Sequence, residues 1–170
     1  FQGSDLTDPD ARNALAKTYG PFDGAVHCAG TAPAALIENL TDEAIDALFR
    51  VKLEVAQWLD RTVAGPLILF GSATAWFGRA GQSAYAAANA ALEGLAFERQ
   101  SRGQEALCVA WGPWDIGMAK GMSLPDGVQA LTASEGLDAL HGAWGQGPSC
   151  CAFRFRPAQF LSARAGRATW

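Results

Sequence analysis

Hydrophobic residues occur along the chain in short continuous runs that alternate with longer segments of helical spacing. Residues 66–70 (Pro-Leu-Ile-Leu-Phe) and 106–110 (Ala-Leu-Cys-Val-Ala) are such runs, and residues 24–27 form a shorter one. Runs of this length, bounded by turn residues, are typical of strands that are buried on both faces of a parallel sheet. We therefore predict an α/β fold: a parallel sheet with helices on both faces.

Two long segments near these runs have the spacing of amphipathic helices. Residues 41–63 begin at Thr41, a candidate N-cap, and repeat apolar residues along one stripe. In residues 83–102 one face carries apolar and small side chains together with a phenol and a carboxamide: Tyr85, Ala88, Asn89, Leu92, Leu95 and Ala96. We predict that both segments are helices packed on the sheet.

Residues near the two ends of the chain indicate where further helices and a further strand begin. Asp8 before Pro9 is typical of a helix start. Residues 132–135 (Thr-Ala-Ser-Glu) form a capping-box pattern that predicts a second short helix. Residues 149–155 alternate apolar and polar side chains, which predicts one half-exposed strand at the sheet edge.

Composition and charge narrow the class of protein. Of the 170 residues, 49% are hydrophobic and 18% are charged, and the formal net charge is −4. An acidic globular domain of this kind is not expected to use nucleic acid or an anionic membrane as its main partner. No apolar run has membrane-spanning length, and we expect a cytoplasmic protein. We assign residues 1–162 to one domain and residues 163–170 to a linker.

The four cysteines give no metal-binding pattern. Cys150 and Cys151 are neighbours, Cys28 and Cys108 fall in or beside expected strands, and no Cys-x-x-Cys or Cys/His cluster occurs. We expect all four to be reduced core residues and predict no metal site.

Lys52 falls on the apolar stripe of the 41–63 helix, which is an unusual place for a cation. Burying an ammonium group is costly unless it has a partner. Either Lys52 has a function in the core, or its stem lies on the stripe and its ammonium reaches the edge. We favour the first interpretation, because Ser72 ends the adjacent expected strand, where open α/β sheets bind ligands.

Ser72, followed thirteen residues later by Tyr85 on a helix, resembles the catalytic signature of short-chain dehydrogenases/reductases. Residues 81–90 (Gly-Gln-Ser-Ala-Tyr-Ala-Ala-Ala-Asn-Ala) are more narrowly similar to the ketoreductase domains of modular polyketide synthases. In those domains Asn stands four residues after the Tyr, and the catalytic Lys comes from the preceding helix, as Lys52 does here. Residues 23–30 and 110–114 resemble further family motifs, so the similarity covers nearly the whole chain.

The resemblance implies a Rossmann-like fold that uses NADPH to reduce a β-ketoacyl thioester carried on an acyl carrier protein. It implies four catalytic residues: Ser72, Tyr85, Lys52 and Asn89. It implies cofactor contacts at Asp5, Leu6, Ala29, Gly30, Gly112, Pro113 and Trp114, and a substrate pocket at Trp76 and Phe77. Ordinary turn geometry and loop packing remain alternative interpretations for Asp5, Gly30 and the two aromatic residues.

The resemblance also bears on the hand of the product alcohol. Residues 32–34 are Ala-Pro-Ala where one product subgroup has Leu-Asp-Asp, which favours the opposite alcohol. The marker Trp of the other subgroup aligns with Phe77, next to Trp76, so this fingerprint is incomplete.

One expected motif is missing from the sequence. No Gly-x-Gly-x-x-Gly follows a strand, although family members use such a turn to hold the cofactor pyrophosphate. We therefore expect the catalytic half of a larger domain, without the N-terminal glycine-rich βαβ portion. The strand around Val26 would then have an unpaired edge, to be covered by another segment, another chain or a self-dimer. Two alternatives remain open: a silent scaffold that binds no cofactor alone, and a reductase of small free carbonyl compounds.

Overall fold

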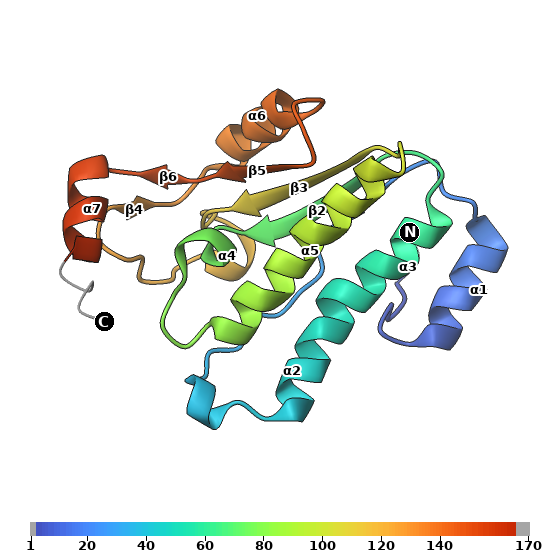
Figure 1. Ribbon diagram of the computed structural model, residues 1–170, viewed down its shortest axis with the longest axis horizontal. Helices are drawn as coiled ribbons and strands as arrows, with labels where there is room; N and C mark the ends of the chain where they lie inside the picture. Colours follow the sequence, from blue (N-terminus) through green and yellow to red (C-terminus); the bar gives the residue numbers. More distant parts are fainter. Residues whose placement is uncertain (1–2, 166–170) are drawn as a thin grey trace.

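The computed structural model describes residues 3–165 as a four-stranded parallel sheet with helices on both faces (Figure 1). The spatial order is β1-β2-β3-β5, and each adjacent pair is parallel. The strands are β1 Ala25–His27, β2 Leu67–Ser72, β3 Ala106–Trp111 and β5 Ser149–Ala152. The predicted α/β class is confirmed, and so are the parallel strands β2 and β3 as buried strands. The prediction that β1 is buried is wrong, because β1 lies at the sheet edge and Val26 is exposed.

The helices begin and end close to the predicted residues. They are α1 Pro9–Tyr19, α2 Asp42–Phe49, α3 Val55–Thr62, α4 Thr74–Phe77, α5 Ser83–Ser101, α6 Ala133–Ala143 and α7 Pro157–Ala165, with 3-10 turns at Ile37–Asn39 and Gly117–Ala119. The side chains of Asp8, Thr41 and Thr132 accept main-chain hydrogen bonds as N-caps. A π-helical turn, Arg50–Glu54, joins α2 to α3, so the predicted 41–63 helix is continuous but has one wide turn.

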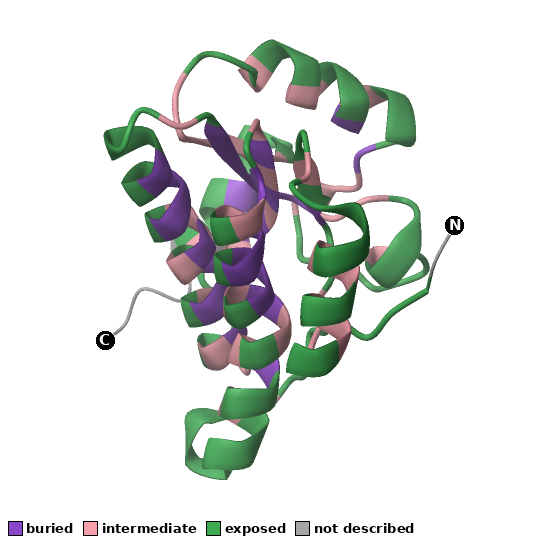
Figure 2. Cartoon of the chain, turned by 90° about the vertical axis from the view of Figure 1, so that its right-hand side faces the viewer, coloured by how far each residue is buried: buried purple, intermediate pink, exposed green. Residues whose placement is uncertain are grey.

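Helices α3 and α5 cover one face of the sheet and bury the larger part of the core. Leu67 and Leu69 of β2 and Cys108 of β3 point to this face. All six residues of the predicted α5 face are buried, from Tyr85 to Ala96. Figure 2 shows the buried residues concentrated where these helices meet the strands. Helix α1 packs beside α3 through half-buried residues (Figure 1).

Helix α6 covers the opposite face, so the prediction of helices on both faces is confirmed. Leu107, Val109 and Trp111 of β3 pack toward it. Trp111 also contacts the ring of Trp114, with centroids 4.9 Å apart. Gly136 of α6 makes this packing possible, because a Cβ there would lie 2.2 Å from the Trp114 ring.

The strand predicted over residues 149–155 is wrong in its second half. Only β5 joins the parallel sheet, whereas β6 (Arg154–Phe155) pairs antiparallel with β4 (Val128–Gln129). Phe153 lies between the two strands and packs on the rings of Phe77 and Phe160. The alternation of apolar and polar residues continues through this change of partner, so the pattern alone could not reveal it.

One smaller expectation is also corrected. Cys28 is exposed rather than buried, because the chain leaves the sheet edge after His27; Cys108 is buried as expected. Helix α7 continues to Ala165, and residues 166–170 of the predicted linker lie outside the described residues, so the division into a domain of residues 1–162 and a linker of residues 163–170 stays a prediction. No helix among the described residues is long and apolar enough to cross a membrane.

Strand β1 forms an open edge of the sheet. Among the described strands it pairs only with β2, and the side chain of Val26 is 56% exposed. This is the unpaired apolar edge that the sequence predicts, and main-chain groups there are open to a further strand.

Candidate active site

The candidate catalytic and cofactor-binding residues gather at the carboxyl edge of the sheet. Strands β1, β2 and β3 are adjacent and parallel, so the residues that follow them lie along one rim, near α4 and the β4–β6 pair (Figure 1). Ser72 ends β2 and is paired in register with Trp111 of β3. Gly30 follows β1 and Gly112 follows β3, on either side of Ser72. The topology therefore brings three separate sequence motifs to one place.

Lys52 is buried in the centre of this region. It lies in the π-helical turn, and its side chain is 2% exposed. Its Nζ donates a hydrogen bond to the carbonyl oxygen of Phe70 at 3.0 Å and lies 5.8 Å from the centroid of the Tyr85 ring. The alternative in which the ammonium reaches the edge of the stripe is therefore wrong.

The surroundings of Lys52 shift the pKa of its amine. Removal from water lowers its pKa below the ordinary value, while the thiols of Cys108 and Cys28 oppose this shift. No carboxylate among the described residues forms an ion pair with it. The Lys52 amine is thus held mainly by one carbonyl dipole and by an aromatic neighbour.

Tyr85 and Asn89 occupy successive turns of α5. Tyr85 is 8% exposed and packs in a small apolar cluster with Leu48 and Ala88. The Asn89 amide Nδ2 donates to the carbonyl oxygen of Tyr85 at 2.7 Å. Its Oδ1 is buried and accepts no hydrogen bond from the described residues. Asn89 therefore holds the main chain of Tyr85, and its Oδ1 can still accept a hydrogen bond from a further donor.

Ser72 combines partial access with a fixed hydroxyl. It is 9% exposed, and its Oγ accepts a hydrogen bond from the main-chain N–H of Thr74 at 3.2 Å. Accepting this bond uses an oxygen lone pair and leaves the hydroxyl proton able to donate elsewhere. The bond also fixes the turn from β2 into α4.

His27 is a site residue that sequence reasoning missed. It ends β1, is 3% exposed, and its Nε2 lies 2.9 Å from the main-chain carbonyl oxygen of Lys52. Burial lowers the pKa of His27 to about 4, so the ring is neutral near pH 7. A carbonyl only accepts, so Nε2 carries the proton. The motif at residues 23–30 was the available signal, but it suggested only a cofactor contact.

The predicted cofactor residues at the strand ends are also used in internal packing. A Cβ on Gly30 would lie 2.5 Å from Cε of Lys52, and one on Gly112 would lie 2.8 Å from the Phe153 ring. The Pro113 carbonyl accepts from the N–H of Leu131 at 2.8 Å. Trp114 packs between Trp111 and α6. Ala29, next to Gly30 in the chain, is exposed. The close packing explains both glycines, while their main chains remain on the rim.

Asp5 and Leu6 lie in the turn before α1. The Asp5 carboxylate accepts from the N–H and the hydroxyl of Thr7, and the N–H bond is the main cause that holds the pKa of Asp5 below its ordinary value. Leu6 is half-buried against the α3–α5 core. Turn hydrogen bonds account for the Asp5 side chain and core packing for Leu6, and their cofactor contacts stay predictions.

The two residues predicted for the substrate pocket point in different directions. The indole of Trp76 is 51% exposed and donates to Oε2 of Glu93 on α5 at 3.1 Å. Phe77 packs in an aromatic cluster with Phe153 at 5.0 Å and Phe160 at 5.5 Å between centroids. Neither contact tests a role in substrate binding.

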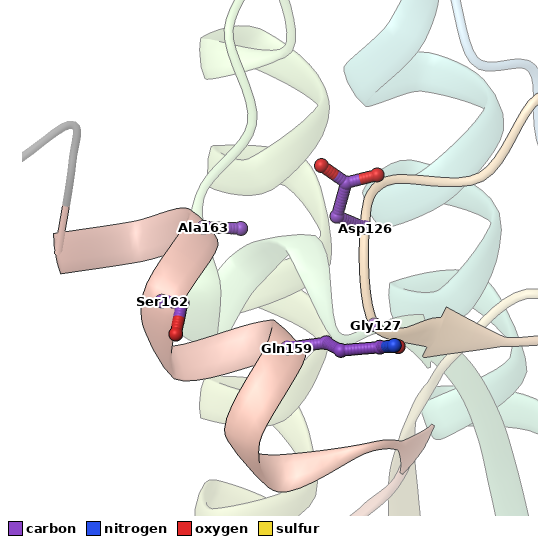
Figure 3. Close-up of a pocket in the computed structure, with 5 residues that line it drawn as sticks. All are labelled: Asp126, Gly127, Gln159, Ser162 and Ala163. Carbon is purple, nitrogen blue, oxygen red and sulfur yellow. The ribbon is translucent and has the colours of Figure 1, made fainter.

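A pocket of about 450 Å³ lies beside α7 (Figure 3). Five residues of the β4 turn and of α7 line it: Asp126, Gly127, Gln159, Ser162 and Ala163. None of the predicted site residues is among them. The predicted catalytic residues Lys52, Ser72 and Tyr85 therefore do not line this pocket.

Comparison with known proteins agrees with this arrangement. The family model of the KR domain matches residues 3–116. The chain is 36% identical over 136 residues to the polyketide synthase GfsE of Streptomyces halstedii, covering 72% of this chain and 4% of that protein. It is also 36% identical over 133 residues to the pikromycin polyketide synthase component PikAII of Streptomyces venezuelae, again covering 4% of that protein.

Solved structures of ketoreductases also resemble this chain. The A-type ketoreductases from a modular polyketide synthase superpose with a TM-score of 0.88 at 33% identity. The first ketoreductase of the tylosin polyketide synthase gives 0.83 at 32% identity. Each match covers 95% of this chain but only 37% and 38% of those chains, respectively. The chain belongs to the ketoreductase domain family of polyketide synthases, within the short-chain dehydrogenase/reductase superfamily, and corresponds to part of such a domain.

Proposed function

We propose that this chain is the catalytic part of a ketoreductase that uses NADPH to reduce a β-ketoacyl thioester carried on an acyl carrier protein. The observation that carries the proposal is the burial of the Lys52 ammonium 5.8 Å from the ring centroid of Tyr85. A buried cation without a carboxylate partner is costly, so a functional use explains why it is there. Family membership supports the same activity.

The residues have complementary roles in the proposed reaction. NADPH, when bound, supplies the hydride that reduces the carbonyl carbon. The Ser72 hydroxyl donates a hydrogen bond to the carbonyl oxygen and stabilises the negative charge that develops on it. The Tyr85 hydroxyl gives its proton to that oxygen, which completes the alcohol. The Lys52 ammonium stabilises the phenolate that remains on Tyr85.

Asn89 supports this arrangement from the next turn of α5. Its Nδ2 is already bonded to the Tyr85 carbonyl, and no hydrogen bond joins it to Lys52 among the described residues. Asn89 and the Lys52 ammonium are therefore not joined directly by a hydrogen bond. We propose that Asn89 fixes the helix turn that carries Tyr85 and that its Oδ1 accepts from a group of the complete site.

We propose that the nicotinamide end of the cofactor lies at the ends of β1 and β3. Ala29 and Gly30 after β1, and Gly112 and Pro113 after β3, offer main chain with little side-chain bulk on either side of Ser72. The sequence has no glycine-rich turn for the pyrophosphate. We propose that a further segment or chain supplies this turn and pairs with the open edge of β1.

Turnover by the protein that contains this sequence tests the proposal. NADPH oxidation is followed with a β-ketoacyl group on acyl carrier protein, and separately with a small free ketone. We expect turnover with the carrier-bound substrate and a loss of about 10²–10⁴-fold in Tyr85→Phe. Turnover of only the free ketone would instead support the reductase of small carbonyl compounds.

A scaffold without cofactor chemistry is the second candidate, favoured by the missing glycine-rich turn. NADPH fluorescence separates the two for this chain alone. Tight binding by the isolated chain would exclude the scaffold, whereas no binding would exclude catalysis by this chain alone. Binding that appears only when that half is added supports the catalytic proposal.

A further inference from the structure

The main chain of Lys52 is held by a side chain from another element. In the π-helical turn the N–H of Val55 bonds to the carbonyl of Arg50, five residues back. A π turn departs from the regular bonding of an α-helix and is often found at functional sites. The carbonyl oxygen of Lys52 accepts from Nε2 of His27, at 2.9 Å, in a buried hydrogen bond. Strand β1 is thereby joined to this turn.

The same strand end also limits where the Lys52 side chain can lie. Gly30 has no Cβ, and the Lys52 stem occupies the space in which one would stand, with Cε 2.5 Å and Nζ 3.1 Å from that position. The ammonium then reaches the Phe70 carbonyl of β2. Main chain, stem and ammonium are thus each held by a different group, and His27 holds the first.

We propose that His27 is a positioning residue: its Nε2–H fixes the π-helical turn so that the Lys52 ammonium lies beside Tyr85. The proposal rests on the proposed function for its catalytic consequence. His27 is buried at the end of β1, and its neutral ring can donate through only one nitrogen. Losing that donor leaves a buried carbonyl unpaired and frees the turn to move. A displacement of about 1 Å at a reacting group can cost about 10²-fold in rate.

Three substitutions at His27 separate positioning from packing. His27→Phe keeps the ring volume and removes the donor. His27→Asn keeps a donor but is too short to place it at the Lys52 carbonyl. His27→Gln places an amide N–H near the position of Nε2. His141→Phe, at an exposed position on α6, is the matched control.

Kinetics of the protein that contains this sequence give the first readout. We expect kcat to fall about 10- to 100-fold in His27→Phe and His27→Asn with little change in KM. His27→Gln should recover most of the rate, and His141→Phe should equal the parent. Unchanged kcat in either of the first two variants, or an equal loss in His27→Gln, would overturn the proposal. Circular dichroism checks the fold of each variant, and the Asn and Gln pair decides the outcome if His27→Phe does not fold.

Lysine NMR gives a second readout that needs no catalysis. The chain has only three lysines, Lys17, Lys52 and Lys120, so the ¹³Cε signal of Lys52 is assignable with Lys52→Met. We expect this signal to move in His27→Phe and His27→Asn and to return toward the parent position in His27→Gln. If the parent protein shows no turnover, the proposed function fails, and an unmoved Lys52 signal would then overturn the positioning role as well.

Discussion

Two cations are buried on the same side of the sheet, and their surroundings differ sharply. Arg99 of α5 is fully buried and makes five hydrogen bonds, one of them in an ion pair with Asp60. Lys52 is 2% exposed and makes one hydrogen bond, to a carbonyl, with no ion pair among the described residues. The hydrogen bonds of Arg99 link α5 to the chain before β2, which is a structural role. The Lys52 amine makes only one hydrogen bond, so it can interact with a neighbouring group such as Tyr85.

This difference shows how a functional cation can be distinguished from a structural one. A planar guanidinium with several donors suits a fixed network of carbonyls. An ammonium on a flexible stem responds to the charge of one adjacent group, here the phenol of Tyr85. Four predictions test whether the two sites really differ in this way.

Replacing Lys52 by Met should have the largest effect on activity. Loss of the ammonium removes the stabilisation of the phenolate, and we expect turnover to fall by about 10²–10⁴-fold. Burying a methionine costs less than burying a cation, so the free energy of unfolding should stay the same or rise. Turnover and urea unfolding of the same sample check both parts. A variant that unfolds easily would place Lys52 with Arg99 as a structural residue.

Replacing Arg99 by Met should show the opposite pattern. The change leaves several buried carbonyls without their donor and leaves Asp60 paired only with the more exposed Arg102. We expect a loss of about 3–5 kcal/mol in the free energy of unfolding. The fraction that remains folded should keep its kcat, because Arg99 holds the sheet from the end opposite to Ser72. Urea unfolding and active-site titration measure the two quantities. A selective fall in kcat without destabilisation would contradict the comparison.

His27 adds a pH dependence to the Lys52 side of the comparison. Burial lowers its pKa to about 4 from an ordinary value of 6.5, so the unfolded chain takes up a proton at a higher pH than the folded chain. Its contribution, about 3 kcal/mol, is therefore complete above pH 6.5 and is lost as the pH falls toward 4. The measurement is the pH dependence of unfolding in the parent and in His27→Gln. Parallel curves through this window would be inconsistent with a buried neutral ring.

Arg102 should give the smallest effect and serves as the surface control for Arg99. Its guanidinium also bonds to Asp60, but the side chain is 38% exposed. Solvent screens such pairs, and we expect Arg102→Ala to lower the free energy of unfolding by less than about 1 kcal/mol. Thermal or urea unfolding beside Arg99→Met shows whether burial makes the difference. Equal losses in the two variants would remove that explanation.

Hydrophobic spacing was enough to predict the framework of this site. Continuous apolar runs identified β2 and β3, and the 3.6-residue period identified the buried face of α5 with Tyr85 and Asn89. The stripe also placed Lys52 in the core, because burial follows from which face a residue occupies. The family resemblance was confirmed by the KR domain match.

Contacts of the main chain could not be predicted from the same patterns. The π turn at Lys52 and the bond from His27 depend on hydrogen bonds between distant segments, which leave no periodic signal. Gly30 was predicted to contact the cofactor, yet the space where its Cβ would stand is occupied by the Lys52 side chain. Side-chain alternation likewise could not show that residues 149–155 change partner at Phe153.

A double-mutant cycle in the rate of ketone reduction tests most directly whether Lys52 and Tyr85 act as one unit. Lys52→Met, Tyr85→Phe and the double variant are compared with the parent under the same conditions. Residues that work together lose most of their contribution with the first substitution, so the double variant should be hardly slower than Tyr85→Phe alone. Losses that multiply, as for independent sites, would contradict the pairing of this ammonium with this phenol.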